Sequence, residues 1–220
     1  MRTSSHLRYL HMFAVAVWSR VGFLLEQGVC NLFRRIARIL RQECGLEFKH
    51  ARGLECRRIE ALAGDGDWVR QAHNLILFGP SGVGKTHLAV AIGHGLTEQG
   101  LSVRYMTATA LVQHLQKARQ ELRLPDALSK LDKYAALVID DLGYVKKSEQ
   151  ETSVLFELIA HRYESASIVI TSNQPFSEWE QVFSDTMMTV AAVDRLVHHA
   201  AIIELTHESY RKRAATEGSL

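Results

Sequence analysis

The sequence predicts a three-layer α/β domain built on a mostly parallel five-stranded sheet. From about residue 56 onward, short apolar runs alternate with longer segments of helical periodicity. One run, residues 135–140, is apolar without alternation, as expected of a parallel strand covered on both faces. Glycine, proline and capping residues separate the two kinds of segment. Together these features indicate a sheet with helices on both sides.

Five segments have the length and composition of buried strands. The strands are expected at residues 73–78, 102–107, 135–140, 166–171 and 201–205. The helices between them are expected at residues 55–64, 84–100, 108–124, 126–134 and 148–163, and one more follows a polar loop after the fourth strand. Gly64 and Gly100 close two of these helices, and Pro125 is expected to end a third. Ser148 and Glu151 form a capping-box pattern at the start of the helix over 148–163.

Composition places few limits on function. The 220 residues are 47% hydrophobic with a net charge of +2, which suits one globular domain and neither favours nor excludes a nucleic-acid partner. The three cysteines, Cys30, Cys44 and Cys56, form no C-x-x-C pair, and their spacing does not support a zinc site with His50. No apolar run reaches the roughly 18 residues of a membrane span, and no cleavage pattern follows the first apolar segment. We therefore expect a cytoplasmic protein with reduced thiols and no membrane partner.

The stretch 79–86, GPSGVGKT, fits the phosphate-binding pattern G-x-x-x-x-G-K-[ST]. It follows an expected strand and opens an expected helix, which is the context that the pattern requires. Glycines let the backbone curl with its N–H groups inward, and the helix N-terminus adds a positive dipole. Lys85 is expected to reach the β- and γ-phosphates of ATP, and Thr86 to ligate Mg²⁺. The nucleotide-binding candidates are Gly79, Pro80, Ser81, Gly82, Val83, Gly84, Lys85, Thr86 and His87.

Two other strand ends carry candidate catalytic residues. Asp140 ends the apolar strand 135–140, where ligands of open α/β sheets gather, and is expected to hold the metal through water. Asp141 follows and is expected to orient or deprotonate the attacking water. Asn173 comes just after the strand 166–171, and its amide is expected to contact the γ-phosphate. The alternatives are an ordinary strand-end turn at Asp140 and an Asx-type turn before Pro175.

The order and spacing of several motifs resemble the IstB family of AAA+ ATPases, which assist the transposases of insertion sequences and are related to DnaC-type helicase loaders. The motifs are GPSGVGKTHLAVAIG, LVIDDLGY, SIVITSNQPFSEW, VDRLVHHA and HESYRKR, and the resemblance runs from about residue 46 to residue 213. It implies an AAA+ ATPase core over residues 46–213. The segment before it (1–45) is basic and helical by pattern and is atypical of the family, and the tail (214–220) is expected to be disordered. Residues 31–40 of the first segment place Leu32, Ile36 and Leu40 on one helical face with arginines opposite, a pattern that suits DNA, an acidic surface or simple packing.

The resemblance also implies roles for individual residues. Lys85 and Thr86 match Walker A, Asp140 and Asp141 match Walker B, and Asn173 matches sensor 1. Arg195 matches an arginine that reaches into a neighbouring subunit's nucleotide; from the residues alone, a surface arginine paired with Asp194 is the alternative. The sheet order of the family places the strand of Asn173 between the strands of the phosphate loop and of Asp140.

Three further expectations follow from the comparison with this family. Lys117, Arg119 and Arg123 lie where helicase loaders carry extra helices, so they are candidates for DNA phosphates or for a solvated helix face. Asp141 stands where many AAA+ proteins have glutamate, so hydrolysis is expected to be slow. Few residues follow the last strand, so no C-terminal helical lid is expected, and Arg211 is a candidate for its sensor arginine.

The sequence thus predicts an ATP-hydrolysing, Mg²⁺-dependent helper of transposition that assembles as a homo-oligomer on duplex DNA and presents it to a transposase. One alternative is a DnaC-like loader of a replicative helicase. A small-molecule kinase is a second, although the arginine-rich lid that it needs is not evident. A degenerate nucleotide-binding protein with little hydrolysis is a third. The pair His198–His199 has no predicted role.

Overall fold

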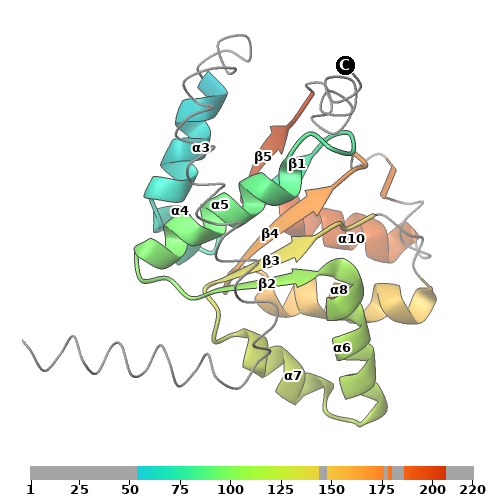
Figure 1. The fold of residues 1–220 in the computed structure, drawn as a ribbon. Helices are drawn as coiled ribbons and strands as arrows, with labels where there is room; N and C mark the ends of the chain where they lie inside the picture. Colours follow the sequence, from blue (N-terminus) through green and yellow to red (C-terminus); the bar gives the residue numbers. More distant parts are fainter. Residues whose placement is uncertain (1–53, 144–147, 176–177, 180–185, 207–220) are drawn as a thin grey trace, which may run out of the picture. The chain divides into compact units, whose positions relative to one another are not determined.

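Five parallel strands form one sheet in the order β2-β3-β4-β1-β5 (Figure 1). The computed structural model describes residues 54–143, 148–175, 178–179 and 186–206. The strands are β1 (Asn74–Phe78), β2 (Val103–Thr107), β3 (Ala136–Asp140), β4 (Ser167–Ser172) and β5 (Ala200–Glu204). The helices are α3 (Leu54–Gly64), α4 (Asp67–Arg70), α5 (Lys85–Glu98), α6 (Ala108–Gln120), α7 (Leu124–Leu131), α8 (Glu149–Arg162) and α10 (Thr186–Val197). The predicted α/β class with a parallel five-stranded sheet is confirmed, and so is the placement of β4 between β1 and β3.

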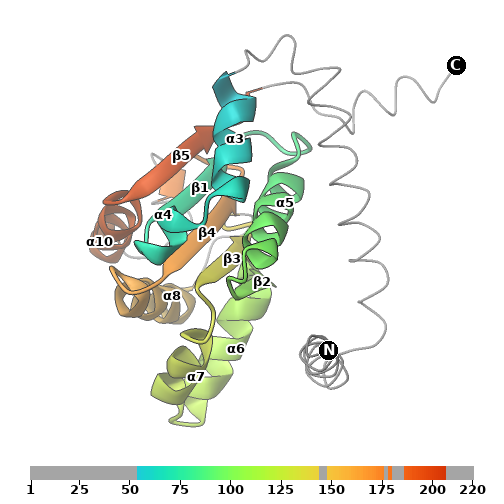
Figure 2. The same ribbon diagram turned by 90° about the vertical axis from the view of Figure 1, so that its left-hand side faces the viewer.

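Helices cover both faces of this sheet (Figures 1 and 2). Successive residues of a strand point to opposite faces, and in β1 Leu75 and Leu77 face one core cluster while Ile76 faces the other. The first cluster packs β1, β3, β4 and β5 against residues of α3, α4 and α5. Because both faces are covered, β3 and β4 are buried along their whole length, which the unbroken apolar run of residues 135–140 predicted for β3.

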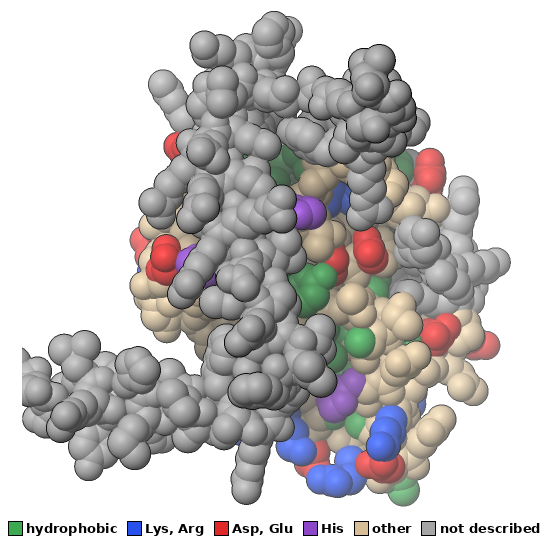
Figure 3. Space-filling view, viewed as in Figure 1, with side chains coloured by type: hydrophobic (Ala, Val, Ile, Leu, Met, Phe, Trp, Pro, Cys, Tyr) green, Lys and Arg blue, Asp and Glu red, His purple; other side chains and the backbone are tan. Residues whose placement is uncertain are grey.

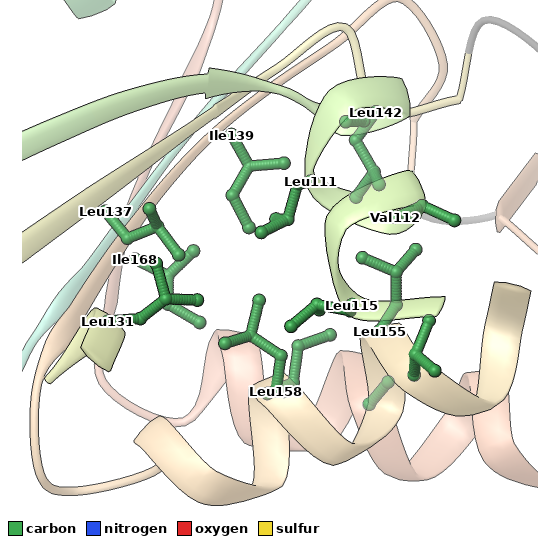
Figure 4. Close-up of a cluster of buried hydrophobic side chains, with 14 of the residues drawn as sticks. Leu111, Val112, Leu115, Leu131, Leu137, Ile139, Leu142, Leu155, Leu158 and Ile168 are labelled. Carbon is green, nitrogen blue, oxygen red and sulfur yellow. The ribbon is translucent and has the colours of Figure 1, made fainter. Parts of the chain in front are cut away.

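The second core cluster joins the opposite face of the sheet to α6, α7, α8 and α10. Figure 4 shows the part between α6, α8 and β3, where Leu111 lies beside Ile139, and Leu115 and Leu155 belong to the same cluster. Each of these side chains is at most 1% exposed. This packing fixes β3, and therefore Asp140 at its end, against helices that lie far away in the sequence.

The observed helices refine the sequence prediction at two places. Pro125 does not end the helix that begins at Ala108: α6 already ends at Gln120, and Pro125 lies in the first turn of α7, where a missing N–H costs no helical hydrogen bond. The four-residue helix α4 was not predicted, because a single turn is too short to show a helical period. The capping box of α8 is confirmed: the Ser148 hydroxyl accepts from the Glu151 amide, and the Glu151 carboxylate accepts from the Ser148 amide.

A buried arginine ties the amino ends of β3 and β4 to the helix layer. Arg162, at the end of α8, is 1% exposed and donates to the carbonyls of Leu131, Tyr134 and Ser167 at 3.0–3.1 Å. Burial lowers the pKa of Arg162 to about 10, while Asp132 acts in the opposite direction, so the guanidinium stays charged at neutral pH. The sequence analysis missed this residue, because an arginine in the last turn of a helix usually points to solvent.

Several predictions concern residues outside the described part of the chain. They are the N-terminal segment 1–45, the tail 214–220, the C-terminal lid and Arg211. Within the described residues, every helix is too short or too polar to cross a bilayer.

Candidate nucleotide-binding site

The loop between β1 and α5 begins where two backbones meet closely. Gly79 has φ +145°, and its N–H donates to the Ser172 carbonyl at 3.3 Å. A Cβ at Gly79 would lie 2.2 Å from the Leu205 carbonyl oxygen, so only glycine fits there. Gly84 caps α5 in the left-handed conformation, with φ +93° and no side-chain cap. The loop is therefore anchored to β4 and to the end of β5, and it presents the start of α5 at the carboxyl edge of the sheet.

Lys85 is held inside this loop. Its ammonium donates to the carbonyls of Gly79 and Pro80 at 2.7 and 2.8 Å, and the residue is 7% exposed. A buried ammonium requires such partners, because an unpaired charge in a low dielectric is costly. The predicted phosphate-binding lysine thus lies beside the curled backbone that the sequence predicted.

Asp140 lies at the centre of a hydrogen-bond network. Its Oδ1 accepts from the hydroxyl of Thr86 at 3.0 Å and from that of Thr171 at 2.5 Å. Its Oδ2 accepts from the Tyr105 hydroxyl at 2.5 Å. Asp140 is 3% exposed, so these hydroxyls supply the hydrogen bonds that a buried carboxylate needs. The structure brings together the two predicted metal-binding residues, Thr86 and Asp140, which lie 54 positions apart in the chain.

Tyr105 is a donor to this carboxylate. Partial burial, the hydrogen bond to Asp140 and the charges of Asp140 and Asp141 all raise the pKa of Tyr105. The hydroxyl therefore keeps its proton at neutral pH and can donate to the Asp140 carboxylate.

Asp141 adopts an uncommon backbone conformation at the end of β3. Its φ is +59°, in the left-handed region that aspartate tolerates better than most residues, and its side chain is exposed. The Asp141 N–H donates to the Thr171 hydroxyl at 2.9 Å, and the next amide, that of Leu142, donates to the Thr171 carbonyl. The conformation is thus fixed by β4, and uncommon backbone conformations of this kind gather at functional sites.

Asn173 follows β4 at the same edge of the sheet, between the phosphate loop and Asp140 in strand order. Its side chain is exposed. The turn before Pro175 is made by the neighbouring Ser172, whose hydroxyl accepts from the Gln174 amide at 3.1 Å and donates to the Gln174 carbonyl at 2.9 Å. These two hydrogen bonds of the turn therefore do not involve the side-chain amide of Asn173.

Arg195 lies apart from the other candidates. It is in the last turn of α10, five residues before β5 begins at Ala200, and Ala200 pairs with the first residue of β1. The phosphate loop follows the other end of β1, so the length of a five-residue strand, roughly 16 Å, separates the two regions along the sheet. Within one chain, the backbone of Arg195 therefore lies toward the amino edge of the sheet, away from the phosphate loop.

The contacts of Arg195 lie within its own layer. Its guanidinium donates to the Ala191 carbonyl at 2.9 Å and lies 5.2 Å from the centre of the Phe156 ring. These contacts leave the side chain half-buried. The alternative from the sequence, pairing with Asp194, is not among these contacts.

Two of the three predicted DNA-contacting residues, Arg119 of α6 and Arg123 before α7, have acidic partners. Arg119 donates to Glu157 at 2.8 Å and to Ser153 at 3.0 Å, and Arg123 lies 3.6 Å from Asp126. Figure 3 shows basic and acidic side chains intermixed over this end of the molecule, and Lys117 is exposed. Such exposed ion pairs contribute little stability, so a phosphate can replace the carboxylate at small cost.

His198 and His199 belong to an exposed polar cluster at the amino edge of the sheet. One ligand atom of each lies within 4.8 Å of the other and of a carboxylate oxygen of Glu164. His198 Nδ1 is also 2.7 Å from the Tyr163 hydroxyl, and the ring of His73 stacks on His199. The cluster is thus separated from the nucleotide site by the length of the strands.

Two site residues were missed by the sequence analysis. Thr171 is the single hydroxyl inside the apolar run 168–171, and Tyr105 lies two residues before the end of β2. A polar side chain near the carboxyl end of a buried strand was the available signal. The contact itself depends on the order of the strands, because β2 and β4 flank β3.

Thr86 and Asp140 have the chemistry of a magnesium site. Mg²⁺ takes hard oxygen ligands and usually keeps several waters, so protein oxygens hold it directly or through water. The Thr86 hydroxyl and the Asp140 carboxylate, joined by a hydrogen bond of 3.0 Å, would supply such oxygens. The residues present therefore fit Mg²⁺ at the mouth of the phosphate loop.

Comparison with known proteins agrees with this geometry. The profile of the family described as IstB-like ATP binding protein matches residues 30–218. An insertion sequence ATP-binding protein of Sinorhizobium fredii is 56% identical over 160 residues, which is 73% of this chain and 54% of that protein. The insertion sequence IS21 ATP-binding protein of Pseudomonas aeruginosa is 39% identical over 165 residues, which is 75% of this chain and 62% of that protein. The chain thus spans between half and two thirds of the length of these relatives.

Solved structures support the same fold. DnaI gives a TM-score of 0.59 at 24% identity, covering 69% of this chain and 82% of DnaI. The DnaC helicase loader gives 0.57 at 19% identity, covering 70% of this chain and 92% of DnaC. These likenesses show the P-loop AAA+ fold. With the family profile matching most of the residues, the chain belongs to the family of IstB-like ATP binding proteins.

Proposed function

We propose that this protein binds ATP with Mg²⁺ and hydrolyses it as a helper of insertion-sequence transposition. The observation that carries the proposal is the 3.0 Å contact between Thr86 and Asp140 beside the phosphate loop. A hydroxyl at the start of α5 and a carboxylate at the tip of β3 meet there, where a nucleotide's phosphates would lie. The names of the relatives, which describe insertion-sequence ATP-binding proteins, favour transposition over helicase loading.

Each residue at this edge has a role that its position supports. The loop amides and Lys85 hold the phosphates, and Thr86 and Asp140 hold Mg²⁺, which when bound neutralises charge on the phosphates. Asp141, fixed by Thr171 and exposed, positions the attacking water and accepts its proton. Asn173 lies between the two sites in strand order and senses the γ-phosphate. These groups bind, orient and move a proton, which is what phosphoryl transfer to water requires.

Hydrolysis also requires positive charge near the transferred phosphate, and we assign that charge to Arg195 of a neighbouring subunit. The backbone of Arg195 lies toward the amino edge of the sheet, away from the phosphate loop of its own chain. A contact between these unlike edges joins subunits head to tail, which generates rings or helices. ATP thereby acts as a switch for assembly.

The assembled protein would hold duplex DNA and present it to a transposase in the cytoplasm. Lys117, Arg119 and Arg123 on and after α6 are the candidates for phosphate contacts. The salt bridges of Arg119 and Arg123 are exposed, which leaves both side chains available for exchange with phosphates. Hydrolysis would release the DNA.

The experiment that tests this proposal is steady-state ATP hydrolysis with and without long duplex DNA. We expect a slow basal rate that duplex DNA stimulates, with the stimulation lost at high salt as phosphate contacts are screened. Lys85→Ala is the blank and should abolish both rates. An equally low rate for the wild type and Lys85→Ala, with and without DNA, would exclude an ATPase.

A further inference from the structure

Tyr105 contacts the carboxylate oxygen of Asp140 that receives no hydrogen bond from Thr86 or Thr171. Thr86 and Thr171 both donate to Oδ1, and Tyr105 donates to Oδ2 at 2.5 Å. Tyr105 belongs to β2 and Thr171 to β4, the two strands that flank β3. The carboxylate is therefore held from both sides of its own strand.

The three hydroxyls do not have equivalent positions. Thr86 is itself a proposed metal ligand, whereas Tyr105 and Thr171 are proposed to contact the carboxylate and not the metal. Tyr105 and Thr171 are therefore the two donors whose role toward Asp140 is positioning. Thr171 is fully buried in β4, whereas Tyr105 is 40% exposed on the edge strand.

The exposure of Tyr105 bears on what this residue does. A tyrosine that serves only as core packing is buried, and Tyr105 is instead an exposed residue whose hydroxyl reaches Asp140. Two residues later, Thr107 caps α6 by accepting from the Ala110 amide. The position of Tyr105 is thus fixed by its strand and by the start of α6, and its polar tip lies at the proposed metal site.

We infer that Tyr105 is a positioning residue for Mg²⁺-nucleotide, acting through Asp140. This inference rests on the proposed function, because it assigns a role within the same site. Hydrogen-bond partners of metal-binding carboxylates orient the ligand, and removing one typically lowers metal affinity or activity by about 10–100-fold. Tyr105 therefore sets the Mg²⁺ affinity of the nucleotide complex and leaves the phosphate loop itself unchanged.

Tyr105→Phe in the full-length chain tests this role, because it removes the hydroxyl and keeps the ring. The affinity for a fluorescent ATP analogue is measured in EDTA and then in rising MgCl₂. We expect the affinity for the analogue in EDTA to stay within about twofold of the wild type. The Mg²⁺ concentration that produces half of the Mg²⁺-dependent change in affinity should rise by about tenfold. Mn²⁺ binding to the same complex, followed by electron paramagnetic resonance, gives a second readout that does not depend on hydrolysis.

Tyr134→Phe is the matched control. It makes the same chemical change on the turn before β3, where the ring lies 6.0 Å from the guanidinium carbon of Arg104. In Tyr134→Phe, the affinity for the ATP analogue should not change in EDTA or in MgCl₂. Thermal unfolding checks that both variants fold: Tyr134→Phe should follow the wild type, and Tyr105→Phe should melt somewhat lower because Asp140 Oδ2 loses its donor.

A double-mutant cycle with Asp140→Asn separates positioning from other effects. If Tyr105 acts through Asp140, Tyr105→Phe should have almost no additional effect on Mg²⁺ dependence in the Asp140→Asn background. Three outcomes would each overturn the positioning role. They are an unchanged Mg²⁺ dependence in Tyr105→Phe, an equal loss of analogue affinity in EDTA and in Mg²⁺, and additive effects of the two substitutions in the cycle. If the wild type binds no nucleotide in either condition, the proposed function itself fails.

Discussion

At the scale of single residues, three hydroxyl side chains donate to one carboxylate at the proposed metal site. Thr171 has two contacts at once: its hydroxyl donates to Asp140 Oδ1 and accepts from the Asp141 amide. It therefore fixes both the proposed metal ligand and the strained backbone that follows. Since Thr171 is fully buried, water cannot replace the hydroxyl without rearrangement.

Thr171→Val should destabilise the protein and lower its ATPase rate. The substitution keeps the shape but leaves the Asp141 amide without this partner, and an unmade hydrogen bond of a buried group costs about 1–3 kcal/mol. Urea unfolding measures the free energy, and steady-state hydrolysis measures the rate. Thr97→Val is the control: the Thr97 hydroxyl donates to the His94 carbonyl on an exposed surface, so its effect should stay within about 0.5 kcal/mol. Equal effects of the two substitutions would contradict the assignment.

At the scale of elements, the start of α5 presents the phosphate loop, and the packing of α3 on α5 holds that helix. A Cβ at Gly95 of α5 would lie 2.5 Å from the Ala63 carbonyl oxygen of α3, so the two backbones approach as closely as glycine allows. Gln99 strengthens the contact, since its amide donates to the Ala63 carbonyl at 2.8 Å and accepts from the Gly66 N–H. Helix α5 is thereby fixed relative to α3 and α4.

Gly95→Ala and Gly93→Ala form a matched pair on this helix. Gly95→Ala forces α3 away and should cost about 2 kcal/mol, within the usual range of overpacked sites. At Gly93 the nearest side-chain atom, Val103 Cγ1, would lie 3.4 Å from the new methyl group, which is ordinary contact. Gly93→Ala should therefore be neutral or stabilise by up to about 1 kcal/mol, as alanine does in a helix interior. Thermal or urea unfolding measures the stability of both variants. A Gly93→Ala variant less stable than Gly95→Ala would contradict the close contact of α3 and α5.

At the scale of the whole molecule, the proposed catalytic groups are divided between two edges of one sheet. The phosphate loop, Asp140 and Asn173 follow the carboxyl ends of strands, whereas Arg195 lies toward the amino end of β5. A single chain therefore does not bring Arg195 to its own phosphate loop. If Arg195 takes part in hydrolysis, a second copy must supply it.

Mixing two inactive variants tests this division. Arg195→Ala and Lys85→Ala should each lose most ATPase activity, by about 10³-fold or more for an arginine that contacts the transferred phosphate. In a mixture, an Arg195→Ala subunit with an intact loop can lie beside a Lys85→Ala subunit with an intact arginine. We expect the mixture to recover activity in proportion to such interfaces. A mixture as inactive as its components, or an Arg195→Ala variant that is fully active alone, would contradict a shared site.

The sequence by itself determined the local features of this protein. The pattern of residues 79–86, the apolar run ending at Asp140 and the capping box at Ser148 depend on neighbours in the chain, so spacing alone revealed them. The alternation of strands and helices fixed the fold class for the same reason. The end of α6 and the short helix α4 were less accessible, because a single turn is decided by its tertiary surroundings.

Only the tertiary structure decided which side chains meet. Tyr105, Asp140 and Thr171 belong to three strands that are adjacent in the sheet but separated by more than 30 positions in the chain. Arg162 became a buried anchor because α8 ends over three carbonyls that other segments supply. Such contacts depend on strand order and helix packing, which involve residues distant in sequence, so no local pattern encodes them.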